Sequence, residues 1–326
     1  MKKTLVALTV AALTATSASA LTVFEENGST IKVGGAVKLS VQKESLSKGT
    51  IAKRVAKDGA KADVGKKTKM RKHDAKINVE AKYAFGDAYA LGFYEYDFLG
   101  STAKKAYVGL GNNAGHQVTF GLQNTFADNV GESSFDNIWG VRKKFLSGDA
   151  DNSIAYRFTG LENWEFGADY VLKTQEFAGY NAAGEVVFEE NKAAFDLGAK
   201  YSANDLTVGF AYGHQKKTNA FDLGLAYQMD NLTFAFDVGY LKMDKTKAYY
   251  VSPGMKAAFG DAAVYGNYNY YKSKTGDAKT KKHGFNLGTE YQLVKNAKVF
   301  AEFNYVKVKD ADKADKAFGV GMKVEW

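Results

Sequence analysis

The last ten residues, Ala317–Trp326, read AFGVGMKVEW, and they show the fold more clearly than any other stretch. The even positions from 318 to 326 are all apolar, and the positions between them hold glycine, lysine or glutamate. Successive side chains of a β-strand point to opposite faces, so this segment has one apolar face and one small or charged face. The pattern predicts a strand that runs to the last residue.

The same alternation recurs along the chain. It is clear in six more segments, Ile31–Gln42, Ala75–Phe85, Trp164–Lys173, Phe195–Tyr201, Leu206–Gly213 and Leu232–Tyr240, and it is blurred in Tyr89–Leu99 and Ala262–Tyr271. Pro253 lies inside the apparent strand Ala248–Ala258 and is followed by Gly254, so we expect a β-bulge or a bend there. Counting the segments predicts about sixteen strands.

The connections between these segments alternate in length. Short turns are predicted at Gly86-Asp87, Ser202–Asp205, Asp230-Asn231 and Gly260-Asp261, and longer polar stretches at Ser45–Lys72, Phe126–Asn152, Thr174–Asn191 and Ser273–Lys282. Up-and-down barrels of the outer membrane have short turns at one end and long loops at the other.

A soluble β-sandwich also alternates, but three features favour a barrel. The segments are about ten residues long, which is the length a tilted strand needs to cross a bilayer. Their apolar faces are rich in aromatic residues, and their other faces carry Lys, Glu and Asp, which a dry core does not accept unpaired. We therefore predict an all-β fold, a transmembrane antiparallel up-and-down β-barrel that occupies residues 21–326.

The first twenty residues have a different character. A basic start is followed by a short apolar stretch and by Ala18-Ser19-Ala20, which is typical of a secretory signal peptide over residues 1–20. An exported chain of this kind has no nucleic acid as a partner. The absence of cysteine excludes disulfides, thiol nucleophiles and cysteine metal sites.

The chain carries a formal charge of +8, and removing Lys2 and Lys3 leaves +6. Much of the excess lies in Lys48–Lys72. Such a run is usually a solvated loop, and the alternative is a surface loop that contacts lipopolysaccharide phosphates.

Four stretches make the chain resemble the general Gram-negative porins, and most closely the major outer-membrane porin of Haemophilus-type (Pasteurellaceae) bacteria. They are Ile31–Ser40, Lys105–Asn112, Tyr249–Tyr271 and Phe318–Trp326. The resemblance implies a sixteen-stranded barrel in the outer membrane, a homotrimer surrounded by outer-membrane lipid and lipopolysaccharide, and a water-filled channel for passive diffusion of small hydrophilic solutes and ions. It also implies an assembly signal on the last strand, carried by Phe318 and Trp326.

The resemblance further implies that the third outer loop, Phe126–Asn152, folds into the pore and faces basic residues of the barrel wall. The loop offers Asp128, Glu132 and Asp136, and the polar strand faces offer Lys38, Lys76, Lys104 and Arg157. Lys76 and Lys104 fall where the family places wall cations. The loop departs from the family because it lacks a Pro-Glu-Phe-Gly-Gly signature and carries Arg142, Lys143 and Lys144.

Two other functions are alternatives. A surface adhesin or ligand-binding barrel would use the long loops Lys48–Lys72 and Thr174–Asn191. An enzyme would need a nucleophile with a positioned base, but His73, His116, His214 and His283 are scattered over different segments, and no Gly-x-Ser-x-Gly or His-Glu-x-x-His motif occurs. We expect neither catalysis nor a metal or other cofactor.

Overall fold

The computed structural model describes residues 20–58, 64–65, 67–140, 145–146, 148–180, 186–191 and 193–326. The predicted signal peptide, residues 1–20, falls almost entirely outside this described part, as do Arg142, Lys143 and Lys144. No helix of the described residues is long and apolar enough to cross a membrane.

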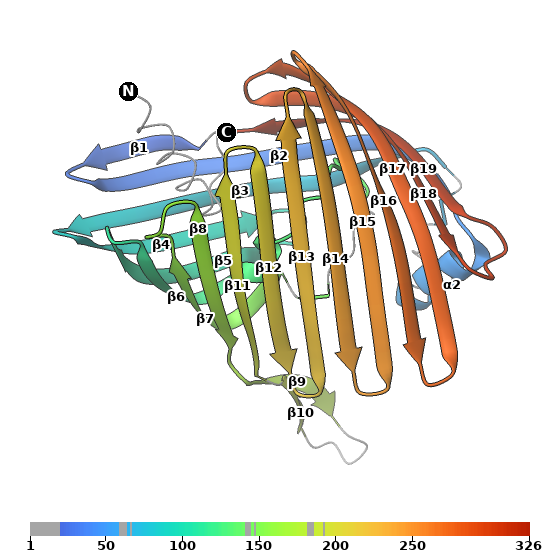
Figure 1. Ribbon diagram of the computed structural model, residues 1–326, viewed down its shortest axis with the longest axis horizontal. Coiled ribbons are helices and arrows are strands. Elements are labelled where there is room, and N and C mark those ends of the chain that lie inside the picture. Colours follow the sequence, from blue (N-terminus) through green and yellow to red (C-terminus); the bar gives the residue numbers. More distant parts are fainter. Residues whose placement is uncertain are drawn as a thin grey trace.

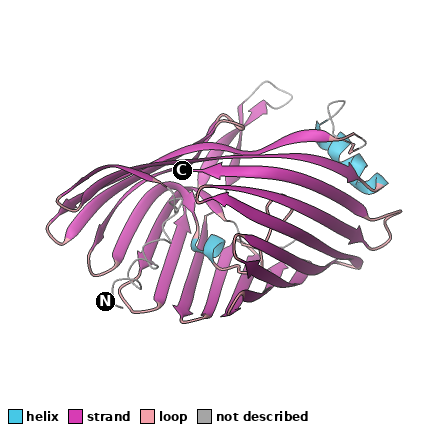
Figure 2. Ribbon diagram, turned by 90° about the horizontal axis from the view of Figure 1, so that it is seen from above, coloured by secondary structure: helices cyan, strands magenta, loops and turns pink. Residues whose placement is uncertain are grey.

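The described residues form an antiparallel barrel of sixteen strands, one additional strand, β1, and a separate two-stranded sheet of β9 and β10 (Figures 1 and 2). Each strand pairs with the next from β2 to β8 and from β11 to β19, and the sheet closes because β8 pairs with β11 and β19 pairs with β2. The strands are β1 (Leu21–Glu26), β2 (Ser29–Ser45), β3 (Lys69–Phe85), β4 (Ala88–Asp97), β5 (Thr102–Asn112), β6 (His116–Asn124), β7 (Asp149–Phe158), β8 (Trp164–Val171), β9 (Thr174–Tyr180), β10 (Val186–Asn191), β11 (Ala194–Ala203), β12 (Leu206–Gln215), β13 (Thr218–Met229), β14 (Leu232–Met243), β15 (Thr246–Phe259), β16 (Ala262–Thr275), β17 (Ala278–Val294), β18 (Ala297–Val308) and β19 (Asp315–Glu325).

Strand β14 shows how the alternating sequence produces two different surfaces. Phe234 and Phe236 are each 41% exposed on the outside of the barrel, whereas Ala235 and Asp237 are buried on the inside. Apolar side chains on the outside meet lipid, and polar side chains on the inside meet the lumen or other polar groups. The predicted fold class is confirmed, and the blurred segments Tyr89–Leu99 and Ala262–Tyr271 fall on strands β4 and β16.

Two of the four stretches predicted to be long loops contain paired strands instead. Ser273–Lys282 is the end of a hairpin in which β16 and β17 continue to a two-residue turn at Gly276-Asp277. Thr174–Asn191 contains the paired strands β9 and β10. The polar composition of Ser273–Lys282 suggested a loop, but the end of the β16–β17 hairpin is polar on both faces of its strands.

Of the β-bulge or bend predicted at Pro253, the bulge is wrong. The register of β15 against β16 is the same on both sides of the proline, because Val251 pairs with Tyr270 and Gly254 pairs with Asn267. The ladder is interrupted for two residues only, while pairing with β14 continues through Pro253. The missing N–H therefore removes bonds on one side without inserting a residue.

The Lys48–Lys72 stretch contains a helix, α2 (Lys48–Asp58), whose first turn is bonded to the connection between β18 and β19. Asp312 accepts the backbone N–H of Lys48 at 3.0 Å. Asp315 accepts the backbone N–H of Ser47 at 2.5 Å and the hydroxyl of Thr50 at 2.6 Å. Carboxylates at a helix N-terminus satisfy its free N–H groups and its dipole, so these two acids stabilise the helix from a distant part of the chain.

The seam where the barrel closes joins the two ends of the described chain. The last strand, β19, pairs with residues Ala36–Ser45 of β2. Trp326 exchanges two backbone hydrogen bonds with Gly35, at 2.7 and 3.0 Å. Strand β1 then pairs with the remaining part of β2, from Leu21 opposite Val33 to Glu26 opposite Ser29. The Trp326 ring lies where a Cβ on Gly35 would come within 2.6 Å of it, so the aromatic residue packs directly on the glycine.

Candidate pore constriction

The connection between β6 and β7, residues 125–148, is here named the constriction loop, and its described residues (125–140, 145–146 and 148) lie against the inner wall (Figures 1 and 2). It starts with a short 3-10 helix, Phe126–Asn129, whose first N–H is donated to Asp169 at 2.7 Å. The ring of Phe126 is buried against Gly167 and Gly198, where a Cβ on either glycine would overlap it. Two inward-facing glycines on neighbouring strands thus form the place where the loop begins its path along the wall.

The second anchor is Asp237 of β14, which is fully buried. Its carboxylate accepts the backbone N–H groups of Glu132 at 2.8 Å and Ser133 at 3.0 Å, and the Ser133 hydroxyl at 2.6 Å. On β16, Asn267 donates its side-chain amide to the Ser133 carbonyl at 2.8 Å. The backbone of the loop is therefore bonded to the wall through both its donors and its acceptors.

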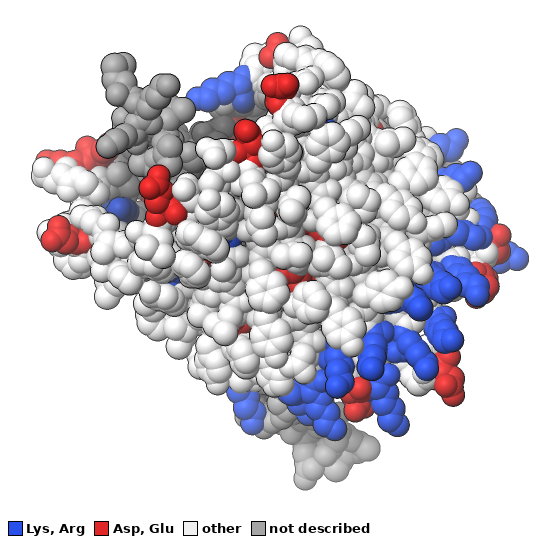
Figure 3. All heavy atoms as spheres, viewed as in Figure 1, with Lys and Arg blue, Asp and Glu red and all other residues white. Residues whose placement is uncertain are grey.

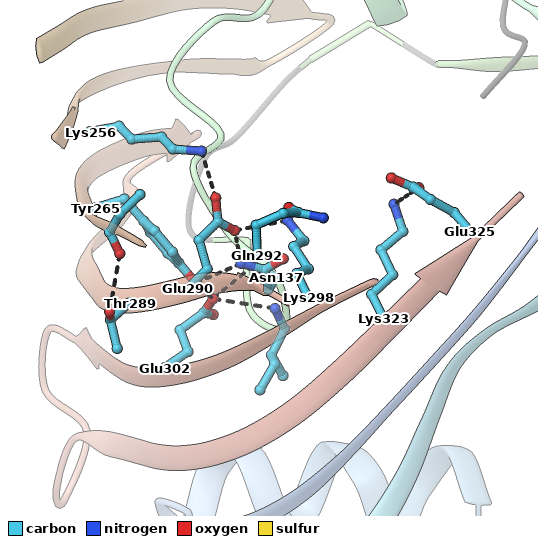
Figure 4. Close-up of polar contacts among 12 residues, drawn as sticks. Asn137, Lys256, Tyr265, Thr289, Glu290, Gln292, Lys298, Glu302, Lys323 and Glu325 are labelled. Carbon is cyan, nitrogen blue, oxygen red and sulfur yellow. Dashed lines mark hydrogen bonds and ion pairs between the residues drawn. The ribbon is translucent and has the colours of Figure 1, made fainter. Parts of the chain in front are cut away.

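The third anchor is Glu302 of β18, shown in Figure 4. It accepts the backbone N–H groups of Asn137 and Trp139, each at 2.7 Å. The side-chain amide of Asn137 also donates to the Tyr265 hydroxyl at 2.8 Å and to Glu290 at 3.0 Å. These bonds hold the middle of the loop against β16, β17 and β18.

Glu290 itself lies between two cations. Lys256 of β15 and Lys298 of β18 donate to its two carboxylate oxygens at 2.6 and 2.8 Å (Figure 4). A carboxylate between two lysines and an amide has its negative charge largely neutralised by neighbours. This cluster joins β15, β17, β18 and the loop into one polar network.

The loop returns toward β7 along β12 and β13. Asp222 accepts the backbone N–H groups of Phe145 and Leu146, each at 3.1 Å, and Leu146 packs against Gly213. Four wall carboxylates therefore hold the constriction loop: Asp169, Asp222, Asp237 and Glu302. The wall residues named here as contacts of the loop lie on β8, β11–β14 and β16–β18.

The three predicted loop acids lie at different places on this path. Asp128 accepts the side-chain amide of Asn124 at 2.7 Å. Glu132 forms an ion pair with Lys200 of β11 at 2.8 Å. Asp136 is half-buried, next to the residue that bonds Glu302.

The four predicted wall cations are paired with acids of neighbouring strands. The distances are 3.2 Å for Lys38–Asp74, 3.1 Å for Lys76–Glu95, 3.8 Å for Lys104–Asp97 and 2.8 Å for Arg157–Asp169. The Lys104 side chain is 53% exposed near the end of β5, whereas the Arg157 side chain is 14% exposed and its guanidinium lies over the Phe126 ring. Arg157 is thus part of the first loop anchor, through Asp169 and Phe126.

Sequence reasoning missed the anchoring acids, although a signal for them was present. Asp-x-Gly occurs on the inner face at Asp196–Gly198, Asp222–Gly224 and Asp237–Gly239. Residues two apart share a face of a strand, so each motif combines an acceptor with space for close backbone approach. The loop uses Gly198, Asp222, Gly224 and Asp237 in this way.

A model of the Gram-negative porin family matches residues 7–311. Two proteins of Pasteurella multocida, each named major outer membrane protein, are 28% identical over 308 residues and 27% identical over 311 residues. Each of these alignments covers 91% of this chain and 81% of the relative.

Solved structures of outer-membrane proteins share the fold. OmpT of Vibrio cholerae has a TM-score of 0.71 at 16% identity, covering 93% of this chain and 99% of its own. An anion-selective porin from Comamonas acidovorans has a TM-score of 0.68 at 17% identity, covering 91% and 100%. OmpF of Salmonella typhi, in complex with daunomycin, has a TM-score of 0.70 at 13% identity, covering 93% and 99%.

The resemblance drawn from the sequence is confirmed by the family match, which covers most of the chain, and by the relatives from Pasteurella multocida. The closed barrel with its apolar exterior places the chain in the outer membrane, where it acts as a channel. The chain belongs to the Gram-negative porin family.

Proposed function

We propose that small hydrophilic solutes and ions diffuse passively through the passage between the constriction loop and the inner faces of β2–β5. One observation carries this proposal: four buried carboxylates, on β8, β13, β14 and β18, hold the loop against one side of the barrel. A loop held against that side narrows the barrel and leaves the opposite wall to line the path. A sixteen-stranded barrel is otherwise wide enough for an aqueous channel.

The wall opposite the loop carries charges of both signs. Lys32–Glu80, Lys38–Asp74 and Lys76–Glu95 are ion pairs between adjacent strands, and their lysine side chains are 22% to 36% exposed. Such pairs present local dipoles to the lumen, which orient water and dipolar solutes. We infer that this polarity favours hydrophilic solutes, because an apolar molecule would have to displace oriented water. The passage consumes no energy and involves no catalytic step.

The assembled form is proposed to be a homotrimer that is exported by a signal peptide cleaved before Leu21. A structure of OmpT from Vibrio cholerae is described as a trimer form, and it shares the fold with a TM-score of 0.68. Cleavage before Leu21 would leave β1 as the start of the mature chain, and β1 pairs along β2 just beyond Trp326. N-terminal sequencing of membrane-derived protein and its mass in mild detergent test these two statements.

Planar-bilayer recordings test the channel. The native protein should give stable, stepwise conductance, and Lys76→Glu should shift the reversal potential in a salt gradient toward cation preference because it reverses a charge on the lining wall. Lys104→Glu should shift it less, because Lys104 lies at the strand end. Lys53→Glu makes the same change of charge at an exposed position of α2, the helix between β2 and β3, and serves as the control.

Two results would contradict the proposal. The absence of stepwise channels from folded protein would exclude diffusion through this barrel. A reversal potential for Lys76→Glu equal to that of the native protein would remove the β2–β5 wall from the conducting path.

A further inference from the structure

Three of the four histidines of the chain pack among aromatic side chains on the outer face of the barrel. The contacts are His116 with Tyr156, His214 with Phe195, and His283 with Tyr268, and these three aromatic side chains are exposed. The fourth, His73 of β3, has different neighbours. Its Nε2 atom lies 2.7 Å from the hydroxyl of Ser40 and 3.2 Å from the side-chain amide of Gln42, which are both buried on the inner face. His73 is therefore the histidine of this chain that faces the lumen.

A β-bulge brings His73 to the inner face. Leu39 and Lys38 are consecutive residues of β2, and they pair with Lys72 and Asp74 of β3. His73 lies between these two pairs and is the additional residue of the bulge. In an unbroken strand, two consecutive side chains point to opposite faces. The bulge lets His73 and Asp74 face the lumen together, and bulges often re-aim a side chain in this way at functional positions.

His73 lies on the wall at the level of the constriction loop. Its neighbour Gln42 is close to Gly319 of β19, where an added Cβ would come within 3.3 Å of the Gln42 side chain. Ile138 and Trp139 of the loop approach the same glycine, at 2.8 and 3.0 Å from that Cβ position. His73 thus borders the proposed passage between the loop and β2–β5 close to the loop itself.

The hydrogen bonds around His73 depend on its protonation state. In a neutral ring with its proton on Nδ1, Nε2 accepts from the Ser40 hydroxyl and from the Gln42 amide. The Gln42 amide also donates to the Ser40 hydroxyl oxygen at 3.0 Å. In the protonated ring both nitrogens are donors, so the Gln42 amide can no longer donate to Nε2. Protonation therefore rearranges this cluster and places a positive charge on the wall.

The fixed charges near His73 are balanced. Two cations and two carboxylates interact with it electrostatically: Lys38 of β2, Arg71 and Asp74 of β3, and Glu302 of β18. A proton on His73 adds a positive charge that these four groups do not compensate. On the side of the barrel shown in Figure 3, the middle of the outer surface is mostly uncharged, so the charges that act on a passing ion at this level belong to the inner face.

We propose that His73 is a selectivity-determining residue whose protonation shifts the channel toward anions. The neutral imidazole leaves the wall beside the loop balanced, and the imidazolium attracts anions and anionic solutes into the passage. Histidine is the side chain whose charge ordinarily changes between about pH 5 and 8. The inference rests on the proposed function, because His73 acts on ions only if they pass along β2–β5.

The test is the reversal potential of single channels in a KCl gradient, measured at pH 8 and at pH 4.5. In the native protein, the ratio of chloride to potassium permeability should rise on acidification. This rise should exceed that of His73→Gln at least about twofold, the size expected of one unit charge beside an ion in screened water. The comparison with His73→Gln removes the contribution of carboxyl groups elsewhere in the lumen.

Two further variants complete the test. His73→Lys carries a positive charge at both pH values, so at pH 8 its permeability ratio should already exceed the native ratio at least about twofold. The matched control is His116→Gln, which removes a histidine of the outer face and should follow the native profile at both pH values.

The outcomes separate this inference from folding defects and from the channel itself. Equal rises in the native protein and His73→Gln would overturn the proposal, as would a native permeability ratio for His73→Lys at pH 8. If His73→Gln gives no folded band in SDS gels, the comparison of native protein with His73→Lys at pH 8 decides in the same way. Stable native channels whose ion preference does not change with pH would refute this inference alone, whereas native protein without channels would refute the proposed function.

Discussion

Replacing Glu302 with alanine should release the middle of the constriction loop and leave the barrel closed. Glu302 is 1% exposed. It accepts hydrogen bonds from the N–H groups of Asn137, Ile138 and Trp139 and from the hydroxyl of Tyr265, at 2.7, 3.3, 2.7 and 2.9 Å. The barrel does not depend on this side chain, because the pairing of β18 with its neighbours is made by backbone groups.

The expected effect follows from these four bonds. A hydrogen bond to a charged group contributes about 1.5–3 kcal/mol, so the four sum to at most about 12 kcal/mol. The freed N–H groups can bond to water in the lumen, and we therefore expect a net loss of about 3–5 kcal/mol from the anchor. A change of this size favours the detached loop by a factor of roughly a hundred to several thousand.

Two measurements report the detachment. Single-channel recordings of Glu302→Ala should show altered conductance and greater open-channel noise than the native protein. The chain contains no cysteine, so Ile138→Cys introduces one thiol at the anchored segment. Its reaction with a water-soluble maleimide should accelerate in the Glu302→Ala background, up to the factor given above.

Glu165→Ala is the matched control, because Glu165 is also a buried inward-facing glutamate but has no hydrogen bond to the described part of the loop. It should leave both readouts close to native values. If Glu302→Ala keeps native conductance, native noise and the native rate of thiol reaction, the carboxylate does not hold the loop and the reasoning is refuted.

Three further predictions concern loop packing, the seam and the outer rim. Gly198→Val should displace Phe126 and alter conductance at a cost of about 1–3 kcal/mol to loop packing, and unchanged conductance would contradict this. Gly35→Ala should force Trp326 away and lower the temperature at which the folded band disappears in SDS gels, and an unchanged temperature would contradict the packing. Burial raises the pKa of Asp312, but backbone N–H bonds lower it by more, so this pKa lies below the usual 3.8. Because the pKa of Asp312 is depressed in the folded protein, its ionised carboxylate stabilises the attachment of α2 above pH 3.8, and this stabilisation is lost as the pH falls through the pKa of the folded state. Proteolysis of α2 should therefore accelerate below about pH 4 in the native protein but not in Asp312→Asn, and an equal acceleration in both would contradict this.

Part of the site was predictable from the sequence. Lys38 and Lys76 were placed on the inner wall because strand parity fixes the face of each residue. Their partners Asp74 and Glu95 come from adjacent strands, and pairing across strands depends on register, which a turn or bulge can shift by one residue. The bulges at His73 and Lys104 are shifts of this kind, and the alternating pattern did not reveal them.

The role of the wall acids required the tertiary structure. From the sequence, Asp222, Asp237 and Glu302 are inward-facing charges like any others. They became loop anchors only because the described residues of the constriction loop turn inward and present backbone N–H groups that need acceptors. The Asp-x-Gly motif marks such positions, but it does not say which segment of the chain occupies them.

The sequence by itself determined the two-faced strands, the barrel and the family, because a side chain's face follows from a period of two and needs no knowledge of distant residues. Only the tertiary structure decided how the constriction loop is held, how α2 is bonded to Asp312 and Asp315, and how His73 comes to face the lumen. Each of these depends on contacts between segments far apart in the chain, and such contacts are fixed by strand register and barrel closure rather than by local composition.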